Sequence, residues 1–143
     1  INAFLDSSHL PNNLRPLLEL FTDVIFELPI KRGGKLIPHE DVVAQLNDET
    51  ISFESEVGFD GQRFAPGAFA QFVNIGLKVE QSKYQKGVQW LHELLYCSQF
   101  TVERLSIAAK KILKDISSQK RAGDTMAAAV VRHLTFDYER SNI

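Results

Sequence analysis

His92, Glu93 and Tyr96 have types and a spacing close to those of a zinc-peptidase helix. In the pattern His-Glu-x-x-His, two imidazoles one helical turn apart hold the metal and the glutamate acts as general base. The second position here is Tyr96, and a phenol stays protonated at neutral pH, so it is a poor zinc ligand. Cys97 lies five residues after His92, on another face of a helix. We interpret the stretch as an exposed polar helix face and Cys97 as a buried structural cysteine.

The other polar groups also have simpler structural interpretations. His39, Glu40 and Asp41 stand at a predicted helix start, where acidic residues complement the helix dipole. Glu54 and Glu56 share one face of a predicted strand, and a solvated polar face accounts for both without acid–base chemistry. The remaining groups lack a partner of the right type or a motif around them: His9, His133, Ser7-Ser8-His9 and Gly33-Gly34.

Composition limits the class of protein that can carry these residues. The chain has 143 residues, 44% hydrophobic and 24% charged, which predicts one soluble domain over residues 1–143. Sixteen basic against eighteen acidic residues argue against a nucleic-acid partner. The chain lacks an apolar run of the roughly 18–20 residues that a membrane span needs. A start at Ile1, with Met126 as the only methionine, indicates a piece of a longer chain.

Helical periodicity predicts five segments. The clearest runs from Pro11 to Leu28, capped by Asn12 or Asn13, and the next from Pro38 to about Asp48. A third covers Gln81–Tyr96, with Val88, Leu91 and Leu95 expected on its inner face and Trp90 and Leu94 beside it. A fourth begins at the cap Thr101, and its inner face is expected to hold Leu105, Ala108, Ala109, Ile112, Leu113 and Ile116. After a break at Ser117–Gly123, Asp124 is expected to cap the last helix.

Alternation predicts strands at Asn2–Asp6, Ile51–Val57 and Ala68–Glu80. Ile51, Phe53 and Val57 are expected to face inward. The last two strands are expected to pair antiparallel across a long turn at Phe59–Gly67. The glycine pair lies in a predicted loop, Lys31–Pro38. The whole is α+β: an antiparallel hairpin or small sheet covered by several helices.

Several phrases together resemble the pitrilysin-like, or inverted zinc, metallopeptidases, and most of all their presequence-protease-like branch. These phrases are Phe4–Ser8, Leu10–Phe21, Gly76–Glu80 and Phe100–Leu105. The family's members, which include insulin-degrading enzyme, are built from four homologous α+β domains that close around a peptide. The resemblance implies that this chain is one such domain, most similar to the third.

The resemblance also implies where a zinc site would lie. The family's first domain holds zinc through His-x-x-Glu-His on its first long helix and a distant Glu. In this sequence Glu19 and Asp23 fall at the histidine positions, Thr22 at the general base and Asp115 near the distant ligand. No histidine lies between His9 and His39, and zinc prefers neutral imidazole. We therefore expect neither metal nor catalysis in this chain, with zinc in another domain of the parent protein.

The expected function is thus a structural, substrate-enclosing domain of a large intracellular zinc metalloendopeptidase, cytoplasmic rather than mitochondrial. Its partners would be other domains of the same parent chain and a peptide substrate, with no nucleic acid and no membrane. Two alternatives stay open. One is a scaffold or interaction module of a non-proteolytic relative. The other is an independent enzyme that uses His92, Glu93 or Cys97.

Overall fold

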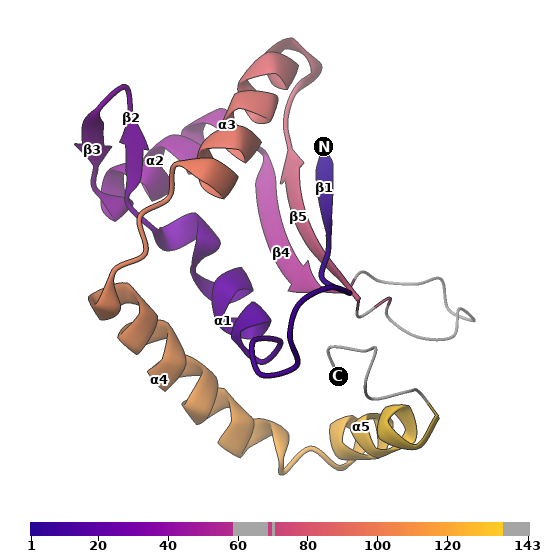
Figure 1. The fold of residues 1–143 in the computed structure, drawn as a ribbon. Coiled ribbons are helices and arrows are strands. Elements are labelled where there is room, and N and C mark those ends of the chain that lie inside the picture. The colour runs from indigo at the N-terminus through magenta and orange to yellow at the C-terminus, as the bar shows by residue number, and fades with distance from the viewer. Residues whose placement is uncertain (59–68, 70, 136–143) are drawn as a thin grey trace.

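A computed structural model describes residues 1–58, 69 and 71–135 and shows the α+β class. Helices alternate along the chain with the strands of a central antiparallel sheet and of a small hairpin (Figure 1). The elements run in this order: β1 Asn2–Asp6, α1 Leu17–Val24, η1 Ile25–Glu27, β2 Ile30–Arg32, β3 Lys35–Ile37, α2 His39–Glu49, β4 Ser52–Val57, β5 Phe72–Lys78, η2 Gln81–Lys83, α3 Tyr84–Tyr96, α4 Val102–Gln119 and α5 Gly123–Thr135.

The main sheet has the order β1-β5-β4, with β5 in the centre and both pairings antiparallel. Ile75 on β5 lies opposite Ala3 on β1 and opposite Ser55 on β4, which fixes the register across the sheet. The predicted antiparallel pairing of the last two strands is confirmed, and the N-terminal strand joins the free side of β5. Among the described strands, β4 has no neighbour on its other edge.

The core lies between one face of this sheet and helices α1, α2 and α3. β5 contributes Ile75 and Leu77, and α3 contributes Trp90 and Leu94, all at most 2% exposed. Burial of such side chains stabilises the fold by roughly 1.5–3 kcal/mol each. Of the inner face predicted for α3, Leu91 and Leu95 pack against this core, whereas the placement of Val88 is wrong, since Val88 is 46% exposed.

Helix α1 is shorter than the predicted Pro11–Leu28. Residues 11–16 form successive turns, in which the Leu14 amide donates to the Pro11 carbonyl at 2.9 Å. Pro16 is the N-cap, because its nitrogen has no hydrogen to donate and its ring restricts the residue before it. Asn12 and Asn13 therefore do not cap the helix, and its first residue, Leu17, is 53% exposed.

The predicted loop Lys31–Pro38 is instead a second hairpin, β2-β3, with Arg32 paired to Lys35. Gly33 and Gly34 form its turn with φ of 57° and 84°. Positive φ at both central residues is the geometry that twists a two-residue turn to match its strands, and glycine adopts it at no steric cost. The strands were missed because three residues each are too few to show alternation.

Several residues expected to lie inside are exposed. Ile51 precedes β4 and is 59% exposed, and Leu113 on α4 is 66% exposed, whereas Ala108 is buried as predicted. Helix α4 also continues to Gln119, past the predicted break at Ser117, and α5 begins at Gly123, so Asp124 lies in its first turn. The predicted turn Phe59–Gly67 lies outside the described residues.

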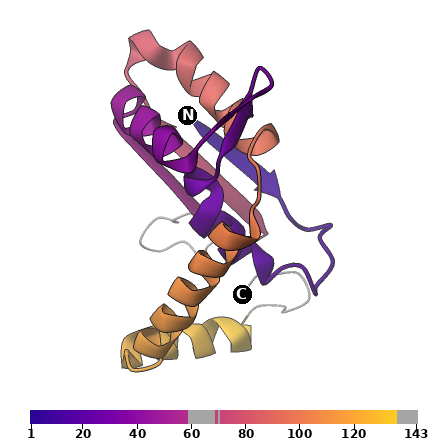
Figure 2. The same cartoon turned by 90° about the vertical axis from the view of Figure 1, so that its left-hand side faces the viewer.

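Helices α4 and α5 form an arm that extends from the body (Figure 2). The base of α4 packs on α1 through a second, small cluster, in which Ala108 meets Val24 and Leu28. The Thr101 hydroxyl accepts a hydrogen bond from the Arg104 amide at 3.3 Å, as predicted for an N-cap. In the part of the chain that is described, neither arm helix nor any other is long and apolar enough to cross a bilayer.

Candidate functional site

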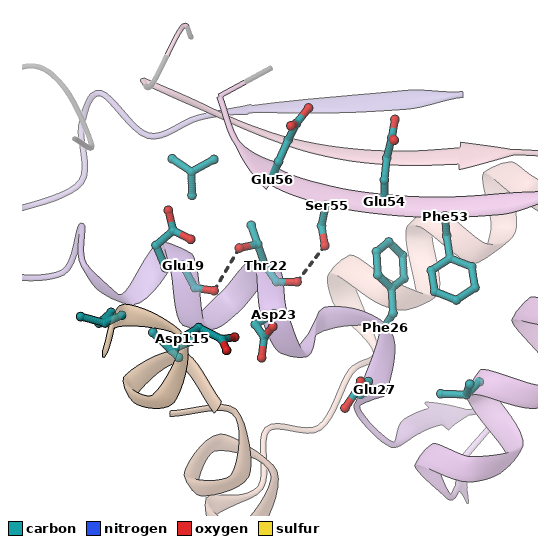
Figure 3. A pocket seen from close by; sticks show the side chains of 14 residues that line it. Glu19, Thr22, Asp23, Phe26, Glu27, Phe53, Glu54, Ser55, Glu56 and Asp115 are labelled. Atoms are coloured by element: carbon teal, nitrogen blue, oxygen red, sulfur yellow. Dashed lines mark hydrogen bonds between the residues drawn. The ribbon is translucent and has the colours of Figure 1, made fainter. Parts of the chain in front are cut away.

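A pocket of about 870 Å³ opens between α1, α4 and β4. All four residues at the zinc-site positions of the resemblance line it: Glu19, Thr22 and Asp23 from α1 and Asp115 from α4. In Figure 3 Asp115 and Asp23 lie on one side of α1, whereas the Glu19 carboxylate points to the other side, toward β4. The long α4 helix thus brings together groups that are more than ninety residues apart along the chain.

The pocket is acidic at its rim and apolar at its floor. Of the fourteen described residues that line it, six carry carboxylates and none carries a basic group. Its floor includes Phe26 and Phe53, whose ring centroids lie 4.8 Å apart with the planes tilted by 48°. Ile112 and Ile116 of α4 form the opposite apolar wall. Such a space suits a group with an apolar stem and a cationic tip.

One wall of the pocket is the edge of β4. Five consecutive residues, Phe53 to Val57, line the same space. Because successive side chains of a strand point to opposite faces, consecutive residues can share a pocket only through the strand's edge. Figure 3 shows this alternation, with Phe53 and Ser55 directed toward α1 and Glu54 and Glu56 directed away. The edge opposite β5 therefore lies along the pocket, without a strand partner in the described chain.

The Thr22 hydroxyl is not free for chemistry. Thr22 is 7% exposed and its Oγ1 donates to the Glu19 carbonyl at 3.0 Å. The Thr22 carbonyl in turn accepts a 2.7 Å hydrogen bond from Ser55 Oγ on β4 (Figure 3). These bonds tie the centre of α1 to the edge strand and leave Thr22 with a structural role.

Two carboxylates of the pocket are neutralised by α4. Lys111 Nζ donates to Asp23 Oδ1 at 2.6 Å, and Arg104 Nη2 donates to Glu27 Oε2. The hydrogen bond to Asp23 raises the pKa of the Lys111 ammonium above its ordinary value, against a smaller opposing effect of burial. Glu19 and Asp115 have no cation within ion-pair distance among the described residues.

The stretch that includes His92 is divided between surface and core. His92 and Tyr96 are exposed, with ring centroids 5.3 Å apart. Glu93, however, is 5% exposed, so its assignment to an exposed polar face is wrong. Cys97 is half-buried at the C-terminal end of α3 and packs against the core.

Glu93 is buried because Arg32 of the small hairpin reaches it. Arg32 Nη2 and Nε donate to Glu93 Oε2 at 2.6 and 3.0 Å, and Gln89 Nε2 donates to Oε1 at 2.8 Å. The guanidinium also lies 5.0 Å from the ring centroid of Trp90, and its Nη1 donates to Gln45 at 3.0 Å. This network is well satisfied and internal, which identifies it as structural.

The other candidates take local structural roles. His39 Nδ1 lies 3.1 Å from Glu40 at the start of α2. Ser7 donates to the Gln71 carbonyl at 2.7 Å, so its hydroxyl is not directed at His9. The Ser8 amide donates to Asp6 Oδ1 at 2.9 Å, and this bond lowers the pKa of the Asp6 carboxyl. The His133 side chain lies outside the described part.

Within the described ranges, His, Cys, Asp and Glu side chains form no group of three or more placed to hold a metal ion. The described lining of the pocket offers carboxylates and hydroxyl groups but no imidazole. That donor set does not fit a zinc site of the inverted type, because borderline zinc sites use imidazole nitrogen to fix and activate a metal-bound water.

The chain is similar to parts of three long eukaryotic proteins, each described as uncharacterized. It is 30% identical over 123 residues to one from Schizosaccharomyces pombe, covering 83% of this chain and 12% of that protein. It is 30% identical over 132 residues to one from Caenorhabditis elegans, covering 92% of this chain and 13% of that protein. It is 26% identical over 124 residues to one from Saccharomyces cerevisiae, covering 82% of this chain and 11% of that protein.

The matched region is thus only about one eighth of each relative's length. No protein-family model and no solved structure matches the chain.

Proposed function

We propose that this chain is a non-catalytic, substrate-enclosing domain of a large zinc metalloendopeptidase. The observation that carries the proposal is the pocket along the β4 edge, which Glu19, Thr22, Asp23 and Asp115 all line. On α1, Glu19, Thr22 and Asp23 have the spacing of the family's zinc-binding helix, but two carboxylates and a hydroxyl stand in place of its histidines and general base. A wall with an unpaired strand edge can enclose a peptide without cutting it.

The length of the relatives supports the proposal that this chain is one domain of a large protein. A region that makes up about one eighth of several long proteins is expected to act with other domains. Zinc and the catalytic helix would then lie elsewhere in the parent chain. If the rest of the parent lacks His-x-x-Glu-His, the scaffold alternative replaces this proposal. The proposal includes an intracellular, cytoplasmic location, with which a single cysteine is compatible and which cell fractionation would test.

A gain of metal binding tests the assignment of the pocket. In the double substitution Glu19→His with Asp23→His, two imidazoles stand at i and i+4 on one face of α1, with Asp115 across the pocket. We expect this variant to bind about one zinc per chain in a calorimetric titration, whereas the native chain binds none and cleaves no peptide.

The matched control is Glu19→Gln with Asp23→Asn, which removes the same charges without adding imidazole. Equal zinc binding by the control and the histidine variant would show that this pocket is not a vacated zinc site. Stoichiometric zinc on the native chain, with peptidase activity, would overturn the non-catalytic assignment.

A further inference from the structure

The pocket and the strand edge together point to one kind of occupant. We propose that the free edge of β4 binds an extended peptide segment with lysine or arginine at alternate positions, as an added strand. This inference rests on the proposed function and specifies its substrate. It begins from the edge itself, where β4 presents main-chain groups that β5 does not reach and that no described strand pairs.

An added strand would place alternate side chains on the two faces of the sheet. Those on the α1 side would lie next to Phe53 and Ser55, above the space that Phe26, Ile112 and Ile116 line. A long aliphatic stem fits that apolar floor. Its tip would reach the rim, where the carboxylates of Glu19 and Asp115 make no ion pair in the described part of the chain. Lysine and arginine combine such a stem with a cationic tip.

Side chains on the opposite face of the added strand would meet Glu54 and Glu56. Both point away from α1 in Figure 3, and both line the pocket edge. Opposite charges on neighbouring strands attract, and like charges repel. An acidic side chain on that face would therefore weaken binding, so the residues between the lysines or arginines are expected to be neutral.

The contribution of charge is modest because Glu19, Glu54 and Asp115 are exposed to solvent. Exposed ion pairs contribute little singly, but several in one cleft raise the local concentration of a cationic ligand. We expect a basic peptide to bind about fivefold more tightly than its neutral counterpart at low salt. The advantage should decline as added salt screens the carboxylates.

The experiment uses the 143-residue chain and three labelled peptides, with binding followed by fluorescence anisotropy. The first peptide alternates lysine with valine. The second has norleucine in place of lysine, which keeps the stem and removes the charge. The third has the lysine sequence with alternate amides N-methylated, which removes donors that strand pairing needs. We expect the first to bind best and the third to lose its binding.

Substitutions in the chain test which carboxylates cause the preference for the lysine peptide. Glu19→Gln with Asp115→Asn should remove much of the preference for lysine over norleucine. The matched control, Asp48→Asn with Glu103→Gln, removes the same charge from exposed positions outside the pocket and should leave the preference unchanged.

The outcomes separate this inference from the proposed function. Equal binding of the lysine and norleucine peptides would overturn the charge selection and leave peptide enclosure standing. Equal binding of the N-methylated peptide would overturn strand addition. No binding by any peptide would overturn the whole inference, while the zinc titration of the histidine variant would still decide the origin of the pocket.

Discussion

Arg32 and Glu93 show how a single pair of residues fixes the position of the small hairpin. Their side chains are 31% and 6% exposed, so the carboxylate is almost fully removed from water. A buried charge is tolerated only when its hydrogen bonds are satisfied. Here the guanidinium, with Gln89, satisfies it and also covers one face of Trp90.

Replacement of Arg32 by methionine tests this pair. Arg32→Met keeps most of the apolar stem but leaves the Glu93 carboxylate buried without its cation, so we expect a loss of about 3 kcal/mol in the free energy of unfolding. Urea unfolding followed by circular dichroism measures the loss. Lys31→Met, at the exposed neighbouring position, should change stability little. Equal effects of both substitutions would contradict the structural role of the pair.

The burial of Glu93 could not be predicted from the sequence near it. Sequence pattern places a glutamate between His92 and Leu94 on a helix and predicts solvent, whereas the partner that buries it lies 61 residues away. By contrast, the resemblance selects Glu19, Thr22, Asp23 and Asp115 in advance, and all four line one pocket. The approach of Asp115 on α4 to the three residues on α1 depends on tertiary packing, which a local sequence pattern does not predict.

At the scale of elements, periodicity found every long segment and misjudged the ends. The strands β4 and β5 and the helices α2, α3 and α4 lie where alternation and helical spacing predict them. The errors lie at the start of α1, where Pro16 sets the first turn, and in β2-β3, which is too short to show a period. Local backbone chemistry determines such ends more than hydrophobic pattern does.

The turn of the β2-β3 hairpin gives a test at this scale. Gly34→Ala places a side chain at φ 84°, where nothing lies within 4 Å, so the cost is backbone strain and not a clash. We expect about 1–2 kcal/mol of destabilisation. Gly123→Ala, also in open space but without a positive φ, should be neutral or slightly stabilising. Thermal unfolding of both variants would contradict this account if their midpoints shifted alike.

The described part of the chain consists of a sheet-and-helix body and an arm formed by α4 and α5. Among the described residues, the main core contains no α4 side chain, and the small cluster at Ala108 connects α4 to α1. Beyond it, the ion pairs of Lys111 and Arg104 hold the arm over the pocket. Along α5, Val130 and Leu134 stay 50% and 77% exposed. The α4 wall of the pocket is therefore attached through one small apolar cluster and two ion pairs.

The pH dependence of the Lys111 pair tests this attachment. Because the pKa of Lys111 is raised in the folded state, its stabilising effect is fully present below the ordinary lysine pKa of 10.5 and is lost as the pH rises through the folded value. We expect Lys111→Met to be less stable than the native chain by at most about 0.5 kcal/mol at neutral pH, since the ammonium is largely exposed.

Urea unfolding of both proteins at neutral and at strongly alkaline pH measures the difference. The gap between them should close at alkaline pH. A gap of constant size would show that Lys111 stabilises the fold by packing its methylenes and not through its charge.

Trp90 gives this architecture a built-in optical reporter. It is the only tryptophan of the chain, its ring is 1% exposed, and its Nε1 donates to Glu49 Oε2 at 2.5 Å. Indole emission shifts to longer wavelength when water reaches the ring, so the emission wavelength reports on the packing of the body around Trp90. Release of the arm would leave this wavelength unchanged. A shift to longer wavelength before the helices unfold would show that the β2-β3 hairpin separates from α3.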